Sequence, residues 1–173
     1  MESLMRRNLP FVLCLVPALA HAADMNLTVE IPALKVAEYH RPYVAVWVER
    51  EDHSVAANLA VWYDTKKADG EGTKWLKDMR QWWRRSGRDQ SMPIDGVSGA
   101  TRPAGQHQLR FTDGKPPLGT LPPGHYELVV EAAREVGGRE AQRIPFDWPA
   151  TRPVHLSAKG SEELGQIDLD LNP

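Results

Sequence analysis

Hydrophobic and polar residues alternate along most of the chain, as in β-strands with one buried face. This alternation predicts strands within residues 27–31, 43–49, 59–63, 106–111, 126–132, 143–148, 154–156 and 167–171. Both faces of 43–49 are apolar, so we expect this strand to be central and to form a hairpin with 59–63. Strands punctuated by loops in this way are typical of an antiparallel β-sandwich, immunoglobulin-like in the broad sense.

Two connections add detail to this mainly β fold. Pro32 is expected to end the first strand. The run from Asp113-Gly114 to Pro123-Gly124-His125-Tyr126 resembles a hairpin connection common in exported sandwich domains, so 106–111 and 126–132 are expected to be its two strands.

One stretch has a helical period instead. Apolar residues recur three or four positions apart at Trp75, Leu76, Met79 and Trp82 or Trp83, with Lys and Arg between them. Thr73 is a plausible N-cap, and Gly87 suits the position after a helix end. The sequence therefore predicts one amphipathic helix, from Lys74 to Ser86, inserted in the β domain.

The first 22 residues have the pattern of a cleaved signal peptide. Arg6 and Arg7 precede a short apolar run, and Ala20-His21-Ala22 is a small-x-small cleavage signal. The apolar run is too short for a membrane span. We therefore expect a periplasmic protein that does not span the membrane after cleavage, with residues 23–173 forming a single β-sandwich domain.

Composition argues against several function classes. The formal net charge of −2 gives no electrostatic case for nucleic-acid binding. The one cysteine, Cys14, lies in the predicted signal peptide, so the mature chain has no disulfide or cysteine metal site. The histidines lack the spacing of metal ligands, and no metal site is predicted.

The segment from Asp95 to Thr101, Asp-Gly-Val-Ser-Gly-Ala-Thr, is the strongest candidate for chemistry. Ser98, Gly99 and Ala100 have little side-chain bulk, and Thr101 presents a hydroxyl beside them. Such a lean backbone lets a second macromolecule approach closely. Modification by a partner enzyme therefore suits the segment better than self-contained catalysis, and no catalytic residue is assigned. The alternative interpretation is a polar turn between two strands.

This segment resembles the acceptor motif for covalent flavin attachment, Asp-x-x-(Ser/Thr)-Gly-Ala-(Thr/Ser). In proteins with this motif, a FAD:protein FMN transferase links the FMN phosphate to the last hydroxyl as a phosphoester. The resemblance implies that Thr101 carries the FMN. It also implies that Asp95, Ser98, Gly99 and Ala100 form the frame that the transferase recognises.

The whole mature chain is similar to a family of small periplasmic proteins of unknown function, often associated with the transferase and with PepSY-type membrane reductases. The matching features include Trp62-Tyr63-Asp64, the 75–83 stretch, Thr101-Arg102-Pro103 and Glu131-Ala132-Ala133-Arg134-Glu135. The resemblance implies an electron carrier between a membrane reductase and a periplasmic acceptor, rather than a stand-alone enzyme. The alternative is a cofactor-free binding or adaptor module.

Residues near the motif have two interpretations each. Arg102 adjoins Thr101 and is the candidate to pair with the flavin phosphate, although an exposed turn arginine is common. Trp82 or Trp83 could stack on the flavin. The favoured alternative is that the helix caps the sandwich with Trp75, Leu76 and Met79 and leaves its arginines in water.

Overall fold

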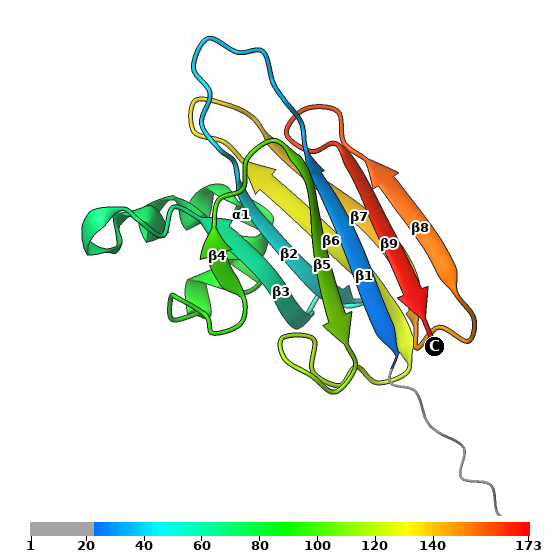
Figure 1. Cartoon of the computed structure of the whole chain (residues 1–173). Coiled ribbons are helices and arrows are strands. Elements are labelled where there is room, and N and C mark those ends of the chain that lie inside the picture. Colours follow the sequence, from blue (N-terminus) through cyan, green and yellow to red (C-terminus); the bar gives the residue numbers. More distant parts are fainter. Residues whose placement is uncertain (1–22) are drawn as a thin grey trace, which may run out of the picture.

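The computed structural model describes residues 23–173, which form two facing β-sheets with a short helical segment on one side (Figure 1). The predicted signal peptide, residues 1–22, lies outside the described residues, as does Cys14. One sheet has the strand order β5-β1-β9-β8, and the other β4-β3-β2-β6-β7. The strands are β1 (Asp24–Ile31), β2 (Tyr43–Arg50), β3 (Val55–Tyr63), β4 (Ser98–Ala100), β5 (Gly105–Thr112), β6 (Gly124–Ala133), β7 (Arg139–Trp148), β8 (Val154–Lys159) and β9 (Gln166–Asn172).

The mainly β architecture is confirmed, and each predicted strand lies within an observed one. β1 ends at Ile31, directly before Pro32, and β2 pairs with β3 on one side and β6 on the other. The short strand β4 was not predicted. It runs parallel to β3, so the five-stranded sheet is mixed.

The predicted hairpin between the strands now labelled β5 and β6 is wrong. β5 pairs with β1 in one sheet, whereas β6 pairs with β2 and β7 in the other. The connection from Asp113 to Pro123 therefore crosses between the sheets. Turn residues indicate that the chain reverses but not which strand it then pairs with.

The main core fills the space between the sheets. In β1, exposure alternates residue by residue, and the inward side chains of Met25, Leu27 and Val29 are essentially buried. They belong to one apolar cluster with residues of the other sheet such as Val46 and Val130. Burial of one such side chain contributes about 1.5–3 kcal/mol, so this repeated pattern determines which face of each strand turns inward.

A second apolar cluster explains why both faces of β2 are apolar. On the outer face of the five-stranded sheet, Ala45 and Trp47 pack with Leu76, Met79 and Trp82 of the helical segment. This segment consists of 3₁₀ helix η1 (Ala68–Asp78), α1 (Arg80–Arg85) and 3₁₀ helix η2 (Gly87–Asp89). It thus covers part of that face.

The prediction of one continuous helix from Lys74 to Ser86 is wrong. The chain leaves helical geometry at Met79 (φ −77°, ψ 75°), and Thr73 lies inside η1 rather than at an N-cap. A new helix starts at α1 because the buried carboxylate of Glu131 on β6 accepts hydrogen bonds from the backbone N–H groups of Gln81 (3.0 Å) and Trp82 (2.8 Å). Within residues 23–173, no helix is both long and apolar enough to cross a membrane.

Candidate functional site

The segment before Thr101 is a closed turn. The Ile94 carbonyl accepts hydrogen bonds from the backbone N–H groups of Val97 (3.2 Å) and Ser98 (2.9 Å). The Ser98 hydroxyl in turn accepts one from the Ile94 N–H (2.9 Å). Gly96 has a φ of +69°, which favours glycine. The turn is therefore built by its own residues, and the Ser98 hydroxyl is part of that construction.

Thr101 follows directly at the end of the edge strand β4. Gly99 and Ala100 pair with Trp62 and Tyr63 of β3, and the Thr101 N–H donates to the Tyr63 carbonyl (3.1 Å). Its backbone is thus attached to the sheet, while its side chain is half-buried. No hydrogen bond within residues 23–173 engages the Thr101 hydroxyl. Of the two hydroxyls in the motif, this one is free to react.

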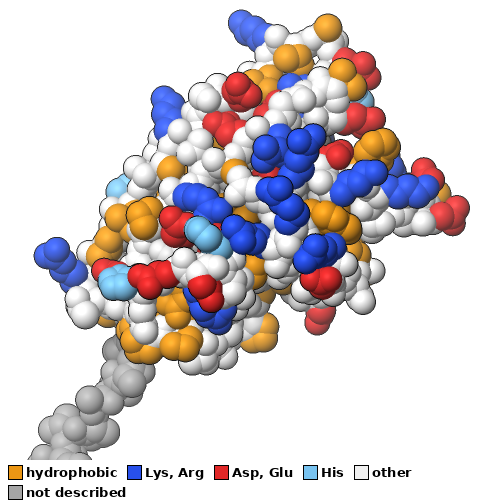
Figure 2. All heavy atoms as spheres, turned by 180° about the vertical axis from the view of Figure 1, so that it is seen from behind, with side chains coloured by type: hydrophobic (Ala, Val, Ile, Leu, Met, Phe, Trp, Pro, Cys, Tyr) orange, Lys and Arg blue, Asp and Glu red, His pale blue; other side chains and the backbone are white. Residues whose placement is uncertain are grey.

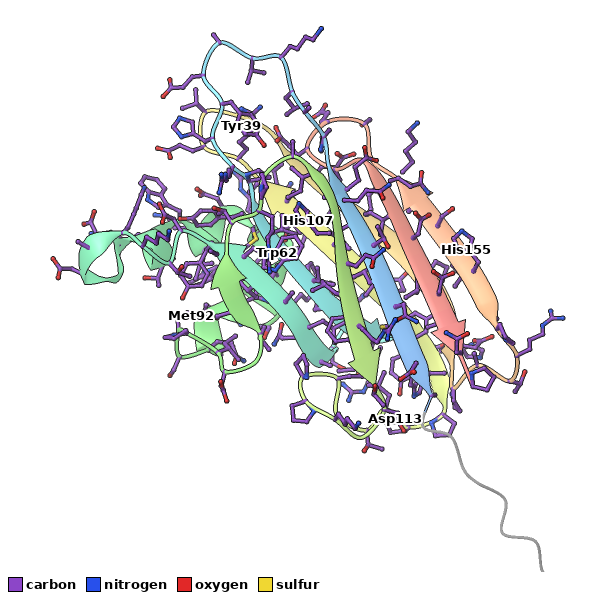
Figure 3. The ribbon with its side chains drawn as sticks, in the orientation of Figure 1. Tyr39, Trp62, Met92, His107, Asp113 and His155 are labelled. Atoms are coloured by element: carbon purple, nitrogen blue, oxygen red, sulfur yellow. The ribbon has the colours of Figure 1, made fainter. Side chains whose placement is uncertain are left out.

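Thr101 lies in the wall of a cavity of about 530 Å³. This volume is within the usual range for small-molecule sites. Four segments far apart in the sequence form the cavity: residues 39–43, residues 64–78 from the end of β3 through η1, Thr101 after β4, and residues 133–135 at the end of β6. The loop that bears Tyr39 can be followed at the top of Figure 3. The wall includes the aromatic residues Tyr39, Tyr43 and Trp75, the basic residues His40, Arg41, Lys67 and Arg134, and the acidic residues Asp64, Asp78 and Glu135.

The structure separates the predicted site residues. Asp95, Ala100 and Arg102 are exposed, whereas Ser98 and Gly99 are half-buried. The Arg102 guanidinium lies over the ring of Trp62, 5.3 Å from its centroid, and Arg102 is not among the cavity-lining residues. Trp62 also meets His107 edge to face, and both residues are labelled in Figure 3. Among the basic side chains, Arg41, Lys67 and Arg134 share the cavity with Thr101, and Arg102 does not.

The tryptophan assignments need correction. Trp82 is fully buried, and its Nε1–H donates to Asn58 Oδ1 (2.9 Å), so it cannot stack on a ligand. Trp83 is partly buried against the second apolar cluster. Trp75, predicted to cap the sandwich, is instead 43% exposed and lines the cavity. The 3₁₀ geometry and the break at Met79 shift the phase of the segment, which places Trp75 off the buried face.

Sequence reasoning missed Tyr39, Arg41, Lys67 and the role of Arg134. The first three lie in irregular segments, where no periodicity indicates which way a side chain points. One signal was present in the 32–42 loop, which places the aromatic residue Tyr39 directly beside the basic residues His40 and Arg41. Only the assembled fold brings these residues to Thr101.

Charge and burial act together at Tyr43, on the cavity wall. Burial raises the pKa of Tyr43, and the nearby carboxylates of Asp64, Glu135 and Asp78 raise it further. Its hydroxyl donates to the Gly72 carbonyl (3.1 Å). Tyr43 is therefore a neutral hydrogen-bond donor that holds the helical segment against the sheet.

A second polar cluster lies away from the cavity. Ligand atoms of Glu49, His53 and Glu127 lie within 4.8 Å of one another. Arg143 already bridges the two carboxylates, with Nη1 at 2.8 Å from Glu49 and 2.6 Å from Glu127. Burial opposes ionisation of Glu49, but hydrogen bonds from Arg143 and Trp47 hold the pKa of its carboxyl below the usual value. The guanidinium thus occupies the position that a metal ion would need.

Comparison with known proteins identifies the family. A family model described as "Predicted periplasmic protein (DUF2271)" matches residues 24–166. The chain belongs to this family. The match covers both sheets apart from most of β9, and the whole Asp95–Thr101 segment. No curated protein matches the chain, and neither does any solved structure. The DUF2271 description supports the predicted periplasmic location and a β-rich domain of unknown function.

Proposed function

We propose that this DUF2271 protein carries FMN as a phosphoester on Thr101 and transfers electrons between a membrane reductase and a periplasmic acceptor. The observation that supports this most strongly is the Thr101 hydroxyl, which has no hydrogen-bond partner in the described part of the chain, belongs to a firmly held backbone and faces a cavity of ligand size. The acceptor pattern ends at this residue. Covalent attachment also explains retention, because an exported protein cannot draw on a cytoplasmic flavin pool.

The attachment step balances as a transfer of FMN from FAD. The Thr101 Oγ1 attacks the FMN phosphorus, the pyrophosphate bond of FAD breaks, AMP leaves and the hydroxyl proton is released. A FAD:protein FMN transferase supplies the active site for this step. Thr101 needs only to be reachable, which suits its position at the end of an edge strand.

The glycine of the motif supports recognition by such an enzyme. Gly99 does not have a positive φ, and a Cβ added there would lie 3.5 Å from Trp62 Cδ1, an ordinary contact. The fold itself therefore tolerates a side chain at this position. A lean backbone at Gly99 and the exposed Ala100 instead suits the close approach of a second protein.

Mass spectrometry of the intact protein tests the proposal after co-expression with the transferase. We expect one FMN adduct on the parent protein and on Thr151→Ala, which removes an exposed threonine hydroxyl outside the motif, and none on Thr101→Ala. An adduct of the same yield on Thr101→Ala would refute the assignment. Flavin fluorescence that survives denaturation provides a second readout of covalency.

A cofactor-free binding module is the second candidate, and a surface hollow favours it. This hollow, of about 430 Å³, is lined by Arg80, Gln81, Arg84, Arg85 and Arg139. Figure 2 shows basic side chains gathered on the face of the molecule seen there. Such a cluster suits an acidic partner. A colourless protein from a host with an active transferase would favour this module over the flavoprotein. The immunoglobulin-like relationship of the sandwich stays a prediction in either case.

A further inference from the structure

We propose that the cavity beside Thr101 is a binding site for the isoalloxazine ring, with Tyr39 and Trp75 contacting the ring and Arg134 donating a hydrogen bond to one of its pyrimidine carbonyls. This inference rests on the proposed flavin attachment and specifies where the attached group lies. The alternative is a ring that swings freely in solvent.

The first observation is an unpaired buried donor. The Arg134 side chain is only 6% exposed, and its Nε and Nη2 atoms donate to the buried Glu163 carboxylate at 2.9 and 3.0 Å. Its Nη1 is buried and has no hydrogen-bond partner within residues 23–173. An unsatisfied buried N–H is costly and rare in native structures. Arg134 lines the cavity, and although Nη1 itself is enclosed, a shift of the guanidinium toward the cavity would let this N–H donate to a carbonyl acceptor bound there.

The second observation is the exposure of large aromatic side chains. Tyr39 and Trp75 are 39% and 43% exposed, and both line the cavity. The Lys67 ammonium lies 5.9 Å from the centroid of the Trp75 ring. Aromatic faces left partly in water gain from contact with a planar ring system. A flavin offers such a ring together with carbonyl acceptors along one edge, which suits both observations.

Covalent attachment through Thr101 means that even a weak binding site can hold the flavin ring. Thr101 lines the same cavity, so a ring held through its phosphate is confined close to the wall. A short flexible linker gives an effective concentration on the order of millimolar. Contacts that would bind free FMN poorly can therefore hold the attached ring.

Flavin fluorescence tests the aromatic contacts, because stacking on tryptophan or tyrosine quenches the flavin. The variants are Trp75→Ala and Tyr39→Ala, with Val36→Ala as the control, since Val36 is 43% exposed in the same loop as Tyr39 but does not line the cavity. At equal covalent flavin, we expect several-fold brighter emission from Trp75→Ala, a smaller rise from Tyr39→Ala and no change in the control. Equal emission from all four proteins would overturn the inference.

If no FMN becomes attached to the protein, the proposed function is contradicted. Binding of a flavin ring in the cavity can then still be tested separately. Free FMN would then be titrated into the unmodified protein and followed by the NMR signals of the tryptophan indole N–H groups. A shift of the Trp75 signal, absent for the buried Trp82, supports the site, and no shift up to millimolar FMN overturns it.

A second arm tests Arg134 without leaving Glu163 as an unpaired buried charge. Arg134→Met is combined with Glu163→Gln, and Glu163→Gln alone is the control. Infrared spectra of the attached flavin report the carbonyl stretches, which move to lower frequency on hydrogen bonding. We expect a higher frequency in the double variant than in the control. The same frequency in both would remove Arg134 from the site.

Discussion

At the residue scale, the structure gives the two hydroxyls of the motif different roles. Ser98 closes the turn through its hydrogen bond with the Ile94 N–H (2.9 Å), while Thr101 is held through its backbone alone. The acceptor pattern assigns the flavin to Thr101, but it does not show that the Ser98 hydroxyl is used in the turn. The attachment proposed at Thr101 needs a reachable hydroxyl, and the Thr101 hydroxyl has no hydrogen-bond partner within residues 23–173 and lies on the cavity wall.

Stability measurements should separate these two hydroxyls. We expect Ser98→Ala to lower the free energy of unfolding by about 1 kcal/mol, because it removes one side-chain hydrogen bond. Thr101→Ala should change it by no more than about 0.5 kcal/mol, as for a side chain without such a bond. Urea unfolding of the unmodified proteins checks both values. A larger loss for Thr101→Ala would show that the hydroxyl has a structural role.

The two glycines of the segment should also behave differently. Gly99→Ala is expected to leave the urea midpoint unchanged, because an added Cβ makes only an ordinary contact with Trp62. It should lower the yield of flavin attachment several-fold if, as proposed, the transferase recognises the bare backbone at this position. Gly96→Ala should destabilise the protein by about 1 kcal/mol, since its φ of +69° is unfavourable for alanine. Attachment is measured by intact mass at limiting transferase. Full attachment to Gly99→Ala would argue against recognition at this position.

At the element scale, periodicity predicted long elements well and short or irregular ones poorly. Strand alternation was decisive because the two sheets bury alternate residues, as in β1. The helical stretch failed because Leu76, Met79 and Trp82 are buried across a break at Met79 rather than along one helix. β4 has three residues, too few for a period, and its pairing with β3 depends on the tertiary fold.

The start of α1 depends on one carboxylate from the sheet. Glu131 is fully buried, accepts the N–H groups of Gln81 and Trp82, and pairs with Arg139 at 3.0 Å. Glu131→Ala is therefore expected to cost about 3 kcal/mol, because it leaves buried donors and a cation without a partner. Guanidinium unfolding measures the loss, with the exposed Glu51→Ala as a neutral control. A cost below about 1 kcal/mol would contradict this role.

The turn before β9 should respond to acid through Glu140. This carboxylate accepts hydrogen bonds from the backbone N–H groups of residues 161–164, at 2.7–3.0 Å. Burial opposes its ionisation, but these bonds prevail and lower its pKa to about 2. Because the pKa of Glu140 is lower in the folded state than its ordinary value of 4.5, ionised Glu140 stabilises the protein at pH values above 4.5. This stabilisation is lost as the pH falls toward 2.

The test compares the parent protein with Glu140→Gln in urea between pH 2 and pH 6. We expect the difference in unfolding midpoint to be largest at pH 6 and to shrink steadily on acidification. A difference that does not vary with pH would mean that the charge of Glu140 contributes nothing.

At the scale of the whole molecule, the sequence predicted two-sided burial in β2 but not how the strands are shared between sheets. The crossing from β5 to β6 shows why, since local turn residues do not encode a partner that is distant in the chain. The cavity has the same origin. Its walls come from four segments that are separated in the sequence. No sequence pattern indicates that Tyr39 or Arg134 lies near Thr101 in the folded protein.

The central claim is that a single hydroxyl of this two-sheet protein bears FMN. Tandem mass spectrometry of the peptide spanning Thr101 tests it most directly, on protein purified from the periplasm of a host that expresses the transferase. The account predicts a flavin phosphate localised to Thr101, with Ser98 unmodified. An unmodified Thr101, or FMN attached to any other residue, would contradict it.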